Sequence, residues 1–295
     1  MPRVNRQRQA WYLLLPMLAI MVVVTGYPLI NTIRLAFTDA MLTGRHAALN
    51  WVGWRNFGYV FGNPDFSDAF VRTLYFAIVS VAIELVLGVL VALLLDRDFV
   101  GRALVRALLV LPWALPTIVN AIMWRLIYNP EFGSLNALLS QFGLIDNYRS
   151  WLGDPDWAMN MVILADVWKT YPLVALIVLA ALQTIPRELY QAAAIDGAGP
   201  WMRFWKITFP HILGPLTVAL ILRLIEAFKV FDIIYVMTRG GPADATKTVS
   251  FFVYQESFSY LRAGSGAAYA LVVALTSAVM IALYITLLRR RERLA

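Results

Sequence analysis

Long runs of apolar residues, separated by polar segments, divide the chain. Runs of 18 residues or more are long enough for a helix to cross a hydrocarbon core about 30 Å thick. Backbone amides find no water in lipid, so such runs are expected to form helices, which satisfy these groups internally. The pattern predicts an all-α membrane protein with six transmembrane helices, at about residues 10–33, 69–95, 104–128, 159–185, 210–236 and 267–289.

The composition supports this prediction. Hydrophobic residues make up 60% of the chain and charged residues only 15%, whereas a soluble domain carries about 25% charged residues. The net charge of +7 comes largely from basic residues at helix boundaries. Membrane topology explains such residues better than nucleic acid does, so we expect no nucleic-acid partner.

Several kinds of chemistry lack the residues they need. The chain has no cysteine, which excludes disulfides, thiolate metal sites and a cysteine nucleophile. Its two histidines, His46 and His211, show no paired spacing typical of a metal site. No G-x-x-x-x-G-K-[S/T] phosphate loop is present, so ATP cannot bind by that route. We therefore expect no enzyme activity, no metal and no cofactor in this chain itself.

The distribution of basic residues predicts the orientation. Six crossings place both termini on one side of the membrane. Segments on that side, 1–9, 96–106, 186–209 and 289–295, carry 13 basic residues, against 8 in the much longer opposite loops. Basic residues accumulate in cytoplasmic loops, so both termini should be cytoplasmic. The basic N-terminus and first apolar run resemble a signal peptide, but the run is too long for one, and we expect a retained helix.

The 186–209 segment is longer than a connector between two helices needs to be. Pro186 and Glu188 suit the start of a helix, and Gly197 and Gly199-Pro200 would end or turn it. The segment is rich in small residues that would let another surface approach the backbone: Ala192, Ala193, Ala194, Gly197 and Ala198. Two interpretations are open at this point, a short helix that meets a partner protein and an amphipathic helix that rests on lipid.

Specific motifs carry a resemblance to a known family. Gln191-Ala192-Ala193, then Gly197, then Ile207-Thr208-Phe209-Pro210 resemble the EAA–G–I–LP loop of binding-protein-dependent ABC importer permeases. The similarity extends over nearly the whole chain and is closest to the carbohydrate branch, in its first permease subunit of the maltose and glycerol-phosphate type. The motifs of that branch are similar to residues 49–57, 111–116, 124–133 and 238–242.

The resemblance implies a type I ABC importer permease fold, with residues 1–295 as a single transmembrane permease domain. It also implies a cytoplasmic coupling helix in the 186–209 segment that docks into a partner ATPase. Gln191 stands where the family usually has glutamate, which puts any salt bridge from that position in doubt. The residues implied in coupling are Glu188, Gln191, Ala192, Ala193, Asp196, Gly197 and Ala198.

The same resemblance implies the partners. They are a second permease subunit, two ATPase subunits that bind ATP and Mg, an extracytoplasmic sugar-binding protein and membrane lipid. The implied location is the cytoplasmic (inner) membrane of a bacterium or archaeon. The implied function is uptake of a di- or oligosaccharide or related glycoside.

Charged residues inside the predicted helices need an explanation, because each costs about 2.5–3.5 kcal/mol near the bilayer centre. They are Asp166 and Lys169 in the fourth helix, and Arg223, Glu226, Lys229 and Asp232 at i+3 spacing in the fifth. They could pair with one another and hold helices in register, or line the transport path. Glu84, in the second helix, is interpreted as a lone structural acid.

The resemblance favours a transport path through the middle of the third, fourth and fifth helices. Ala227 and Val230 cannot hydrogen-bond through their side chains, and Lys169 and Arg223 add charge, so an anionic sugar stays open as the substrate. Trp168 could stack on a sugar ring or pack against a neighbour, and Thr117 and Asn120 could contact substrate or another helix. The candidate path residues are Thr117, Asn120, Asp166, Trp168, Lys169, Thr170, Leu173, Arg223, Glu226, Ala227 and Val230.

Two other classes of function are alternatives. An ion-coupled secondary transporter would also explain charges inside the membrane, but inverted repeats, which would favour it, are not evident. An intramembrane enzyme would need a histidine at membrane depth, whereas His211 lies at a predicted boundary and His46 in a loop.

Overall fold

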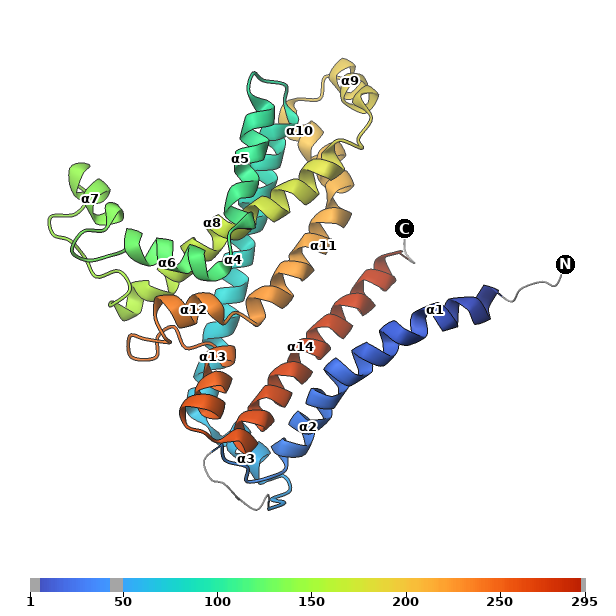
Figure 1. Ribbon diagram of the computed structural model, residues 1–295. Coiled ribbons are helices and arrows are strands. Elements are labelled where there is room, and N and C mark those ends of the chain that lie inside the picture. Colours follow the sequence, from blue (N-terminus) through green and yellow to red (C-terminus); the bar gives the residue numbers. More distant parts are fainter. Residues whose placement is uncertain (1–5, 43–49, 293–295) are drawn as a thin grey trace. The chain divides into compact units, whose positions relative to one another are not determined.

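The computed structural model describes residues 6–42 and 50–292 (Figure 1). Within these ranges the chain is helical and has no strand, apart from one isolated antiparallel bridge between Thr38 and Trp51. His46 lies outside the described residues, as do parts of the segments 1–9, 49–57 and 289–295 used in the sequence analysis.

Among the described residues, five helices are long and apolar enough to cross a membrane. The first, Trp11–Ala36, is formed by α1 (Arg6–Met21), a π-helical turn (Val22–Gly26) and α2 (Tyr27–Ala36). The others are α4 (Pro64–Asp96), α8 (Pro155–Leu182), the run from α10 (Pro200–Arg203) through a second π-helical turn (Phe204–Thr208) to α11 (Phe209–Phe228), and the apolar part, Ala263–Ala282, of α14 (Ala263–Glu292).

The third predicted helix, 104–128, is wrong as a single straight helix. It is instead α5 (Arg102–Ala114) and α6 (Thr117–Ile127), which meet at an angle of 96°. Leu115 and Pro116 between them have extended backbone torsions. A proline has no N–H to donate and disfavours helical torsions at the residue before it, so the helix breaks here. Counted as one bent span, the pair makes the sixth crossing.

The fifth predicted helix, 210–236, is also wrong at its end. Helix α11 ends at Phe228, and the chain turns before the short helix α12 (Asp232–Met237). No proline or glycine marks this break, so the local sequence did not indicate it. The freed carbonyl of Val230 accepts a hydrogen bond of 3.1 Å from the Thr248 hydroxyl. A distant residue therefore satisfies the backbone where the helix stops, as lipid requires.

The chain divides into two units, each described by itself. The first comprises residues 1–66 and 252–276. In it, the buried amide of Asn56, from α3 (Arg55–Gly62), donates to the carbonyls of Ala36 and Thr38 at 2.9 and 2.8 Å. Asn50 donates to the Asp39 carboxylate, which lowers the pKa of Asp39 below its usual range. These bonds connect the end of α2 to α3 and hold the loop between them.

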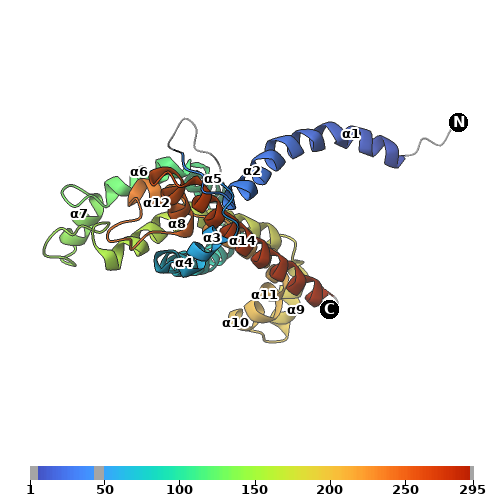
Figure 2. The same ribbon diagram turned by 90° about the horizontal axis from the view of Figure 1, so that it is seen from below.

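The second unit comprises residues 67–251 and 277–295. Within it α8 packs against α5 and α11, and α12 packs against α6 (Figures 1 and 2). Helix α8 is the central element, because sixteen of its residues are buried. Gly88 of α4 lies so close to α8 that an added Cβ would come within 2.5 Å of Val174 Cγ1. Small residues allow such close helix contacts in a membrane.

Shorter elements lie between the long helices of the chain. Helix α7 (Ser134–Gln141) belongs to the loop between α6 and α8, and α13 (Val249–Tyr254) continues into a π-helical turn (Gln255–Ser259). Helix α9 (Arg187–Ile195) lies with α10 beyond the end of α8, while α12 follows the opposite end of α11 (Figure 1). The predicted 186–209 segment and the break in α11 are therefore at opposite ends of α11.

Candidate functional site

Arg223 of α11 is the centre of an ion cluster that joins three helices. Its Nε and Nη2 donate to the two carboxylate oxygens of Glu84 from α4, at 2.6 and 3.0 Å. Its Nη2 also donates to Asp166 Oδ2 of α8 at 3.2 Å, and its Nη1 donates to Glu226 Oε2 at 2.5 Å. One guanidinium thus binds carboxylates from α4, α8 and its own helix.

This geometry is the strong form of an ion pair. The planar guanidinium matches the two oxygens of a carboxylate, so the contact with Glu84 has two parallel hydrogen bonds. Both side chains are buried, and Thr170 of α8 donates its hydroxyl to the same Glu84 at 2.8 Å. Each buried charge has a partner, which is the condition for keeping charges away from water.

Glu84 is therefore not a lone acid, and that part of the sequence interpretation is wrong. Its partner Arg223 lies 139 residues away in the sequence, and no local pattern links the two positions. The only available signal was that an unpaired carboxylate inside a membrane helix is costly, so a cation had to be near it.

A cleft of about 370 Å³ lies against this cluster, where α11 breaks. Its lining combines charged, hydroxyl and aromatic side chains from α4, α5, α6, α8, α11, α12 and the break itself. In the order of the chain the lining residues are Phe76, Trp113, Thr117, Asp166, Lys169, Thr170, Arg223, Glu226, Ala227, Lys229, Val230, Phe231, Asp232 and Ile233.

The structure brings together most of the path residues expected from the sequence. Eight of them line the cleft: Thr117, Asp166, Lys169, Thr170, Arg223, Glu226, Ala227 and Val230. The other three do not. Asn120 is buried and donates to the carbonyl of Ala165 at 3.1 Å, and Trp168 packs edge-on against Trp124 with ring centroids 5.9 Å apart. Leu173 is partly buried on α8, away from the lining.

Sequence reasoning missed several lining residues. Trp113 is brought in by the bend between α5 and α6, and Phe231 by the break after α11. Both features fall within segments, 104–128 and 210–236, that the sequence predicts as single helices. Lys229 and Asp232 had been noted as charges but not as path residues, and Phe76 and Ile233 gave no polar signal.

The two interpretations of the intramembrane charges apply to different residues. Arg223 is paired with three carboxylates. Lys169 is partly exposed in the cleft and forms no ion pair in the described part of the chain. Arg223 is held inside the protein by its partners, whereas Lys169 is available to a ligand.

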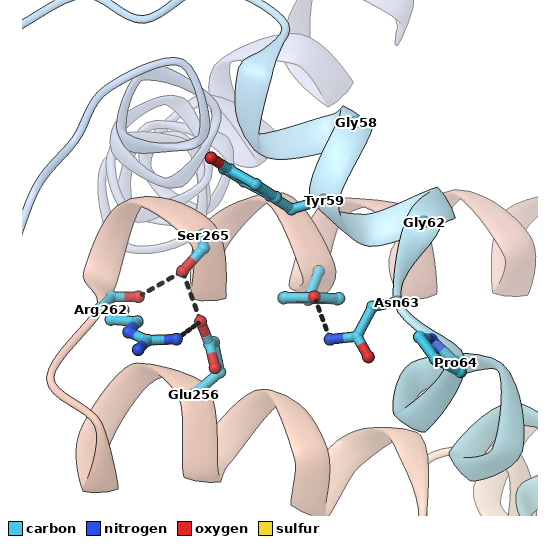
Figure 3. A pocket seen from close by; sticks show the side chains of 9 residues that line it. Gly58, Tyr59, Gly62, Asn63, Pro64, Glu256, Arg262 and Ser265 are labelled. Carbon is cyan, nitrogen blue, oxygen red and sulfur yellow. Dashed lines mark hydrogen bonds and ion pairs between the residues drawn. The ribbon is translucent and has the colours of Figure 1, made fainter.

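A larger cavity, of about 600 Å³, lies in the first unit (Figure 3). Figure 3 shows Arg262, Glu256 and Ser265 turned toward one another. Ser265 donates to Glu256 at 2.7 Å, Arg262 lies 3.5 Å from the same carboxylate, and Asn63 donates to the Tyr269 hydroxyl at 2.9 Å. Five polar side chains of this cavity are thus already bound within it, so we take the cleft as the candidate site.

The residues expected to contact an ATPase lie on and just after α9. The helix starts after Pro186, with Glu188 in its first turn, as the sequence predicted. None of its side chains is buried. Glu188, Gln191, Ala192, Asp196 and Gly197 are exposed.

The end of this segment combines a tight turn with exposed apolar residues. Ala193 and Ala198 are partly exposed. Gly197 has a φ of +79°, a left-handed conformation that favours glycine, and an added Cβ would meet nothing within 4 Å. Ile195 and Trp201 expose 87% and 73% of their surfaces. Such exposed apolar side chains are typical of a surface that another molecule covers.

The 186–209 segment is nevertheless tied to the rest of its unit. The Tyr190 and Thr208 hydroxyls are 2.9 Å apart, and Arg203 Nε donates to the carbonyl of Ala198 at 2.9 Å. These contacts hold α9 to the start of α11. A force on α9 would therefore be passed to the helix that carries Arg223.

A metal site is not supported by the described residues, because no group of three or more His, Asp or Glu side chains among them could hold an ion. The acids around Arg223 are occupied by that cation and by Thr170.

The fold is similar to that of a solved structure. The chain superposes with a TM-score of 0.84 on a bacterial ABC transporter involved in the import of the acidic polysaccharide alginate. The match covers 97% of this chain and 96% of the other, at 24% sequence identity. At that identity the likeness shows a common fold, that of an ABC importer permease.

Sequence relatives span nearly the same length. The chain is 41% identical over 251 residues to the trehalose/maltose transport system permease protein MalF of Thermococcus litoralis, covering 84% of this chain and 83% of that protein. It is 34% identical over 280 residues to the sulfoquinovosyl glycerol transport system permease protein SmoG of Agrobacterium fabrum, covering 95% and 90%. It is also 36% identical over 226 residues to the sn-glycerol-3-phosphate transport system permease protein UgpA of Pectobacterium atrosepticum, covering 76% of each.

A family model matches most of the chain, from residue 84 to residue 293. Its first matched residue is the Glu84 that binds Arg223, and the match includes the cleft and the 186–209 segment. The chain belongs to the family of binding-protein-dependent transport system inner membrane components.

Proposed function

We propose that this chain is a permease subunit of an ATP-driven importer, and that its cleft forms one half of a path for a saccharide. The observation that carries the proposal is the cleft at the break of α11, which gathers charged and aromatic side chains between helices that are otherwise apolar. Ionisable residues inside a membrane protein commonly mark the path of a substrate. A broken helix at membrane depth is tolerated where it lines such a cavity.

The lining suits a saccharide in particular. Sugar hydroxyls can accept from Lys169 and exchange hydrogen bonds with the Thr117 hydroxyl. Trp113, which is 44% exposed, offers an apolar ring face for the C–H face of a sugar. The relatives named above are permeases for trehalose and maltose, for sulfoquinovosyl glycerol and for glycerol 3-phosphate, which are all polyhydroxylated.

The energy for transport comes from partner proteins in this proposal. Two ATPase subunits bind ATP and Mg, and this chain supplies no cofactor site. Helix α9 docks on one ATPase through the exposed face that includes Glu188, Gln191 and Ala192, with Gly197 at its end. A second permease completes the path, and an extracytoplasmic binding protein delivers the saccharide. One solved structure of similar fold is an alginate transporter in complex with its periplasmic protein, which supports this last partner by analogy.

The orientation completes the proposal. Both termini and α9 lie on the cytoplasmic side of a bacterial or archaeal inner membrane, and residues 1–295 act as one permease domain. The bias of basic residues supports this orientation. The most apolar stretch of the Trp11–Ala36 helix is not buried by the rest of the described chain. This exposure supports a position next to lipid or next to a second permease.

A secondary transporter driven by an ion gradient is the alternative. Charges inside the helices would suit it equally well. Membership of the binding-protein-dependent family and the exposed, tethered α9 favour the importer instead.

The test is ATPase activity of the complex purified with its partner subunits in lipid, measured with the matching binding protein against a panel of neutral and anionic saccharides. Stimulation by one saccharide supports the proposal and names the substrate. A chain that assembles with no ATPase, and transports only when an ion gradient is imposed, would support the secondary transporter.

A further inference from the structure

The partners of Arg223 differ in how they hold it. Glu84 binds two of its nitrogens, Nε and Nη2, and Asp166 binds Nη2 as well. Glu226 alone binds Nη1. Acids from α4 and α8 thus bind one edge of the guanidinium, while Nη1 donates separately to Glu226.

The exposure of the three acids follows the same division. The side chain of Glu84 is fully buried and that of Asp166 is 12% exposed, whereas that of Glu226 is 61% exposed. Glu226 also lines the cleft together with Arg223, and Glu84 does not. Glu226 is therefore the one acid of the cluster that combines contact with Arg223 and broad exposure to the cleft.

These differences determine which carboxylate a ligand oxygen can replace at Arg223. Removing Glu84 from Arg223 would leave a buried charge without its bidentate partner, which is strongly unfavourable. Separating Glu226 from Nη1 breaks a pair in which only the Glu226 side chain is exposed. Arg223 keeps its bonds to Glu84 and Asp166, and the released carboxylate stays in contact with the open cleft. A ligand oxygen can therefore take the place of Glu226 at small cost, but not that of Glu84.

We infer that Glu84 and Glu226 act on Arg223 in opposite directions. Glu84 is a positioning residue that presents the guanidinium to the cleft, and Glu226 competes with a saccharide oxygen for Nη1. This inference rests on the proposed function, because it takes the cleft as the site where the saccharide binds. It assigns opposite effects to two carboxylates that contact the same side chain.

The chemistry of the exchange is a replacement of one acceptor by another. Nη1 donates to a carboxylate in the empty cleft and to a sugar hydroxyl or ring oxygen in the loaded cleft. Glu84 keeps its two bonds to Arg223 and its bond from Thr170 throughout. The direction of the guanidinium is therefore preserved while the acceptor on Nη1 changes.

The test measures binding of radiolabelled trehalose and maltose to the complete complex in lipid nanodiscs, without binding protein and without nucleotide. Under these conditions the affinity reports on the permease alone. In Glu226→Gln the saccharide competes with a neutral amide, so we expect binding about two- to fivefold tighter than in the unmodified complex. In Glu84→Gln the guanidinium loses its fixed direction, and we expect binding about tenfold weaker or more.

Asp232→Asn is the matched control. Asp232 is also an exposed acid that lines the cleft, but it does not contact Arg223. Equal tightening in Asp232→Asn and Glu226→Gln would overturn the inference, because it would show a general effect of negative charge. Unchanged or weaker binding in Glu226→Gln would overturn it as well.

Two further results are distinguishable. Failure of the unmodified complex to bind either saccharide, or any other saccharide of the panel, would count against the proposed function and remove the basis of the inference. If Glu84→Gln does not assemble, the comparison of Glu226→Gln with Asp232→Asn decides the inference by itself, since both of those side chains are exposed.

Discussion

Arg223 of α11 and Glu84 of α4 are 139 residues apart in the sequence and form two hydrogen bonds, at 2.6 and 3.0 Å, inside the helical unit. The pair connects α11, which leads from α9 to the cleft, with α4, and Asp166 of α8 binds the same guanidinium. Any movement of α11 during transport has to carry this pair with it or change it.

The first prediction concerns the stability that this pair provides. Glu84→Ala leaves Arg223 buried with only Asp166 and Glu226, and we expect the free energy of unfolding to fall by about 3–5 kcal/mol. The measurement is unfolding of the purified chain in detergent, followed by circular dichroism. Asp68→Ala is the control, because its partner Arg72 is 3.6 Å away on the surface and the loss there should stay below about 1 kcal/mol. Equal losses in the two variants would contradict the prediction.

The second prediction separates coupling from folding at Gly197. Gly197→Trp should abolish saccharide-stimulated ATPase activity while the chain still inserts into the membrane, because a large side chain would block the docking of α9. Gly143 offers a matched control, since it also has a positive φ, of +68°, and open space around it. Gly143→Trp carries the same backbone strain, so it should keep stimulated activity if docking is what matters. A complex indifferent to Gly197→Trp would exclude docking at this turn.

The third prediction concerns Lys169, which lines the cleft without an ion pair in the described residues. Lys169→Ala should raise the saccharide concentration that half-stimulates the ATPase by about tenfold, the usual loss for one hydrogen bond to a charged group. Assembly with the ATPase, judged by co-purification, should not change. Unaltered saccharide dependence would instead assign Lys169 to the packing of α8.

The fourth prediction distinguishes two tryptophans. Trp113 lines the cleft and is 44% exposed, whereas Trp168 packs against Trp124 and does not line it. Trp113→Ala should weaken saccharide binding and leave the unfolding midpoint nearly unchanged. Trp168→Ala should lower the free energy of unfolding by about 3 kcal/mol, as expected when a large packed side chain is removed. Binding titrations and thermal unfolding of both variants check the pair, and a reversal of these effects would show that the sequence-based stacking role of Trp168 is right.

Local sequence patterns were sufficient for much of the fold. Hydrophobic run lengths located the membrane helices because a helix must cover the bilayer with apolar side chains along its whole length. Helix-start signals predicted where α9 begins, because Pro186 and Glu188 act within one turn of the helix. The motifs around Gln191 and Gly197 indicated the family that the match over residues 84–293 shows.

Patterns along the chain were less informative at the cleft. The bend at Leu115-Pro116 had a visible local cause, but the break after Phe228 has none, because the Thr248 hydroxyl that satisfies Val230 comes from another segment. Asn120 and Trp168 carry side chains that suit a sugar path, yet they contact Ala165 and Trp124 instead. Which way a side chain points depends on the neighbours that surround its helix.

The sequence by itself determined that the chain crosses a membrane as helices, that α9 lies between the fourth and fifth of them, and that costly charges are present inside the helices. Only the tertiary structure decided how those charges are satisfied, with Arg223 bound by Glu84 and Lys169 left open to the cleft. The physical reason is the range of the interactions. Hydropathy and capping act between residues near in sequence, whereas an ion pair between α4 and α11 exists only once α8 has brought both helices together.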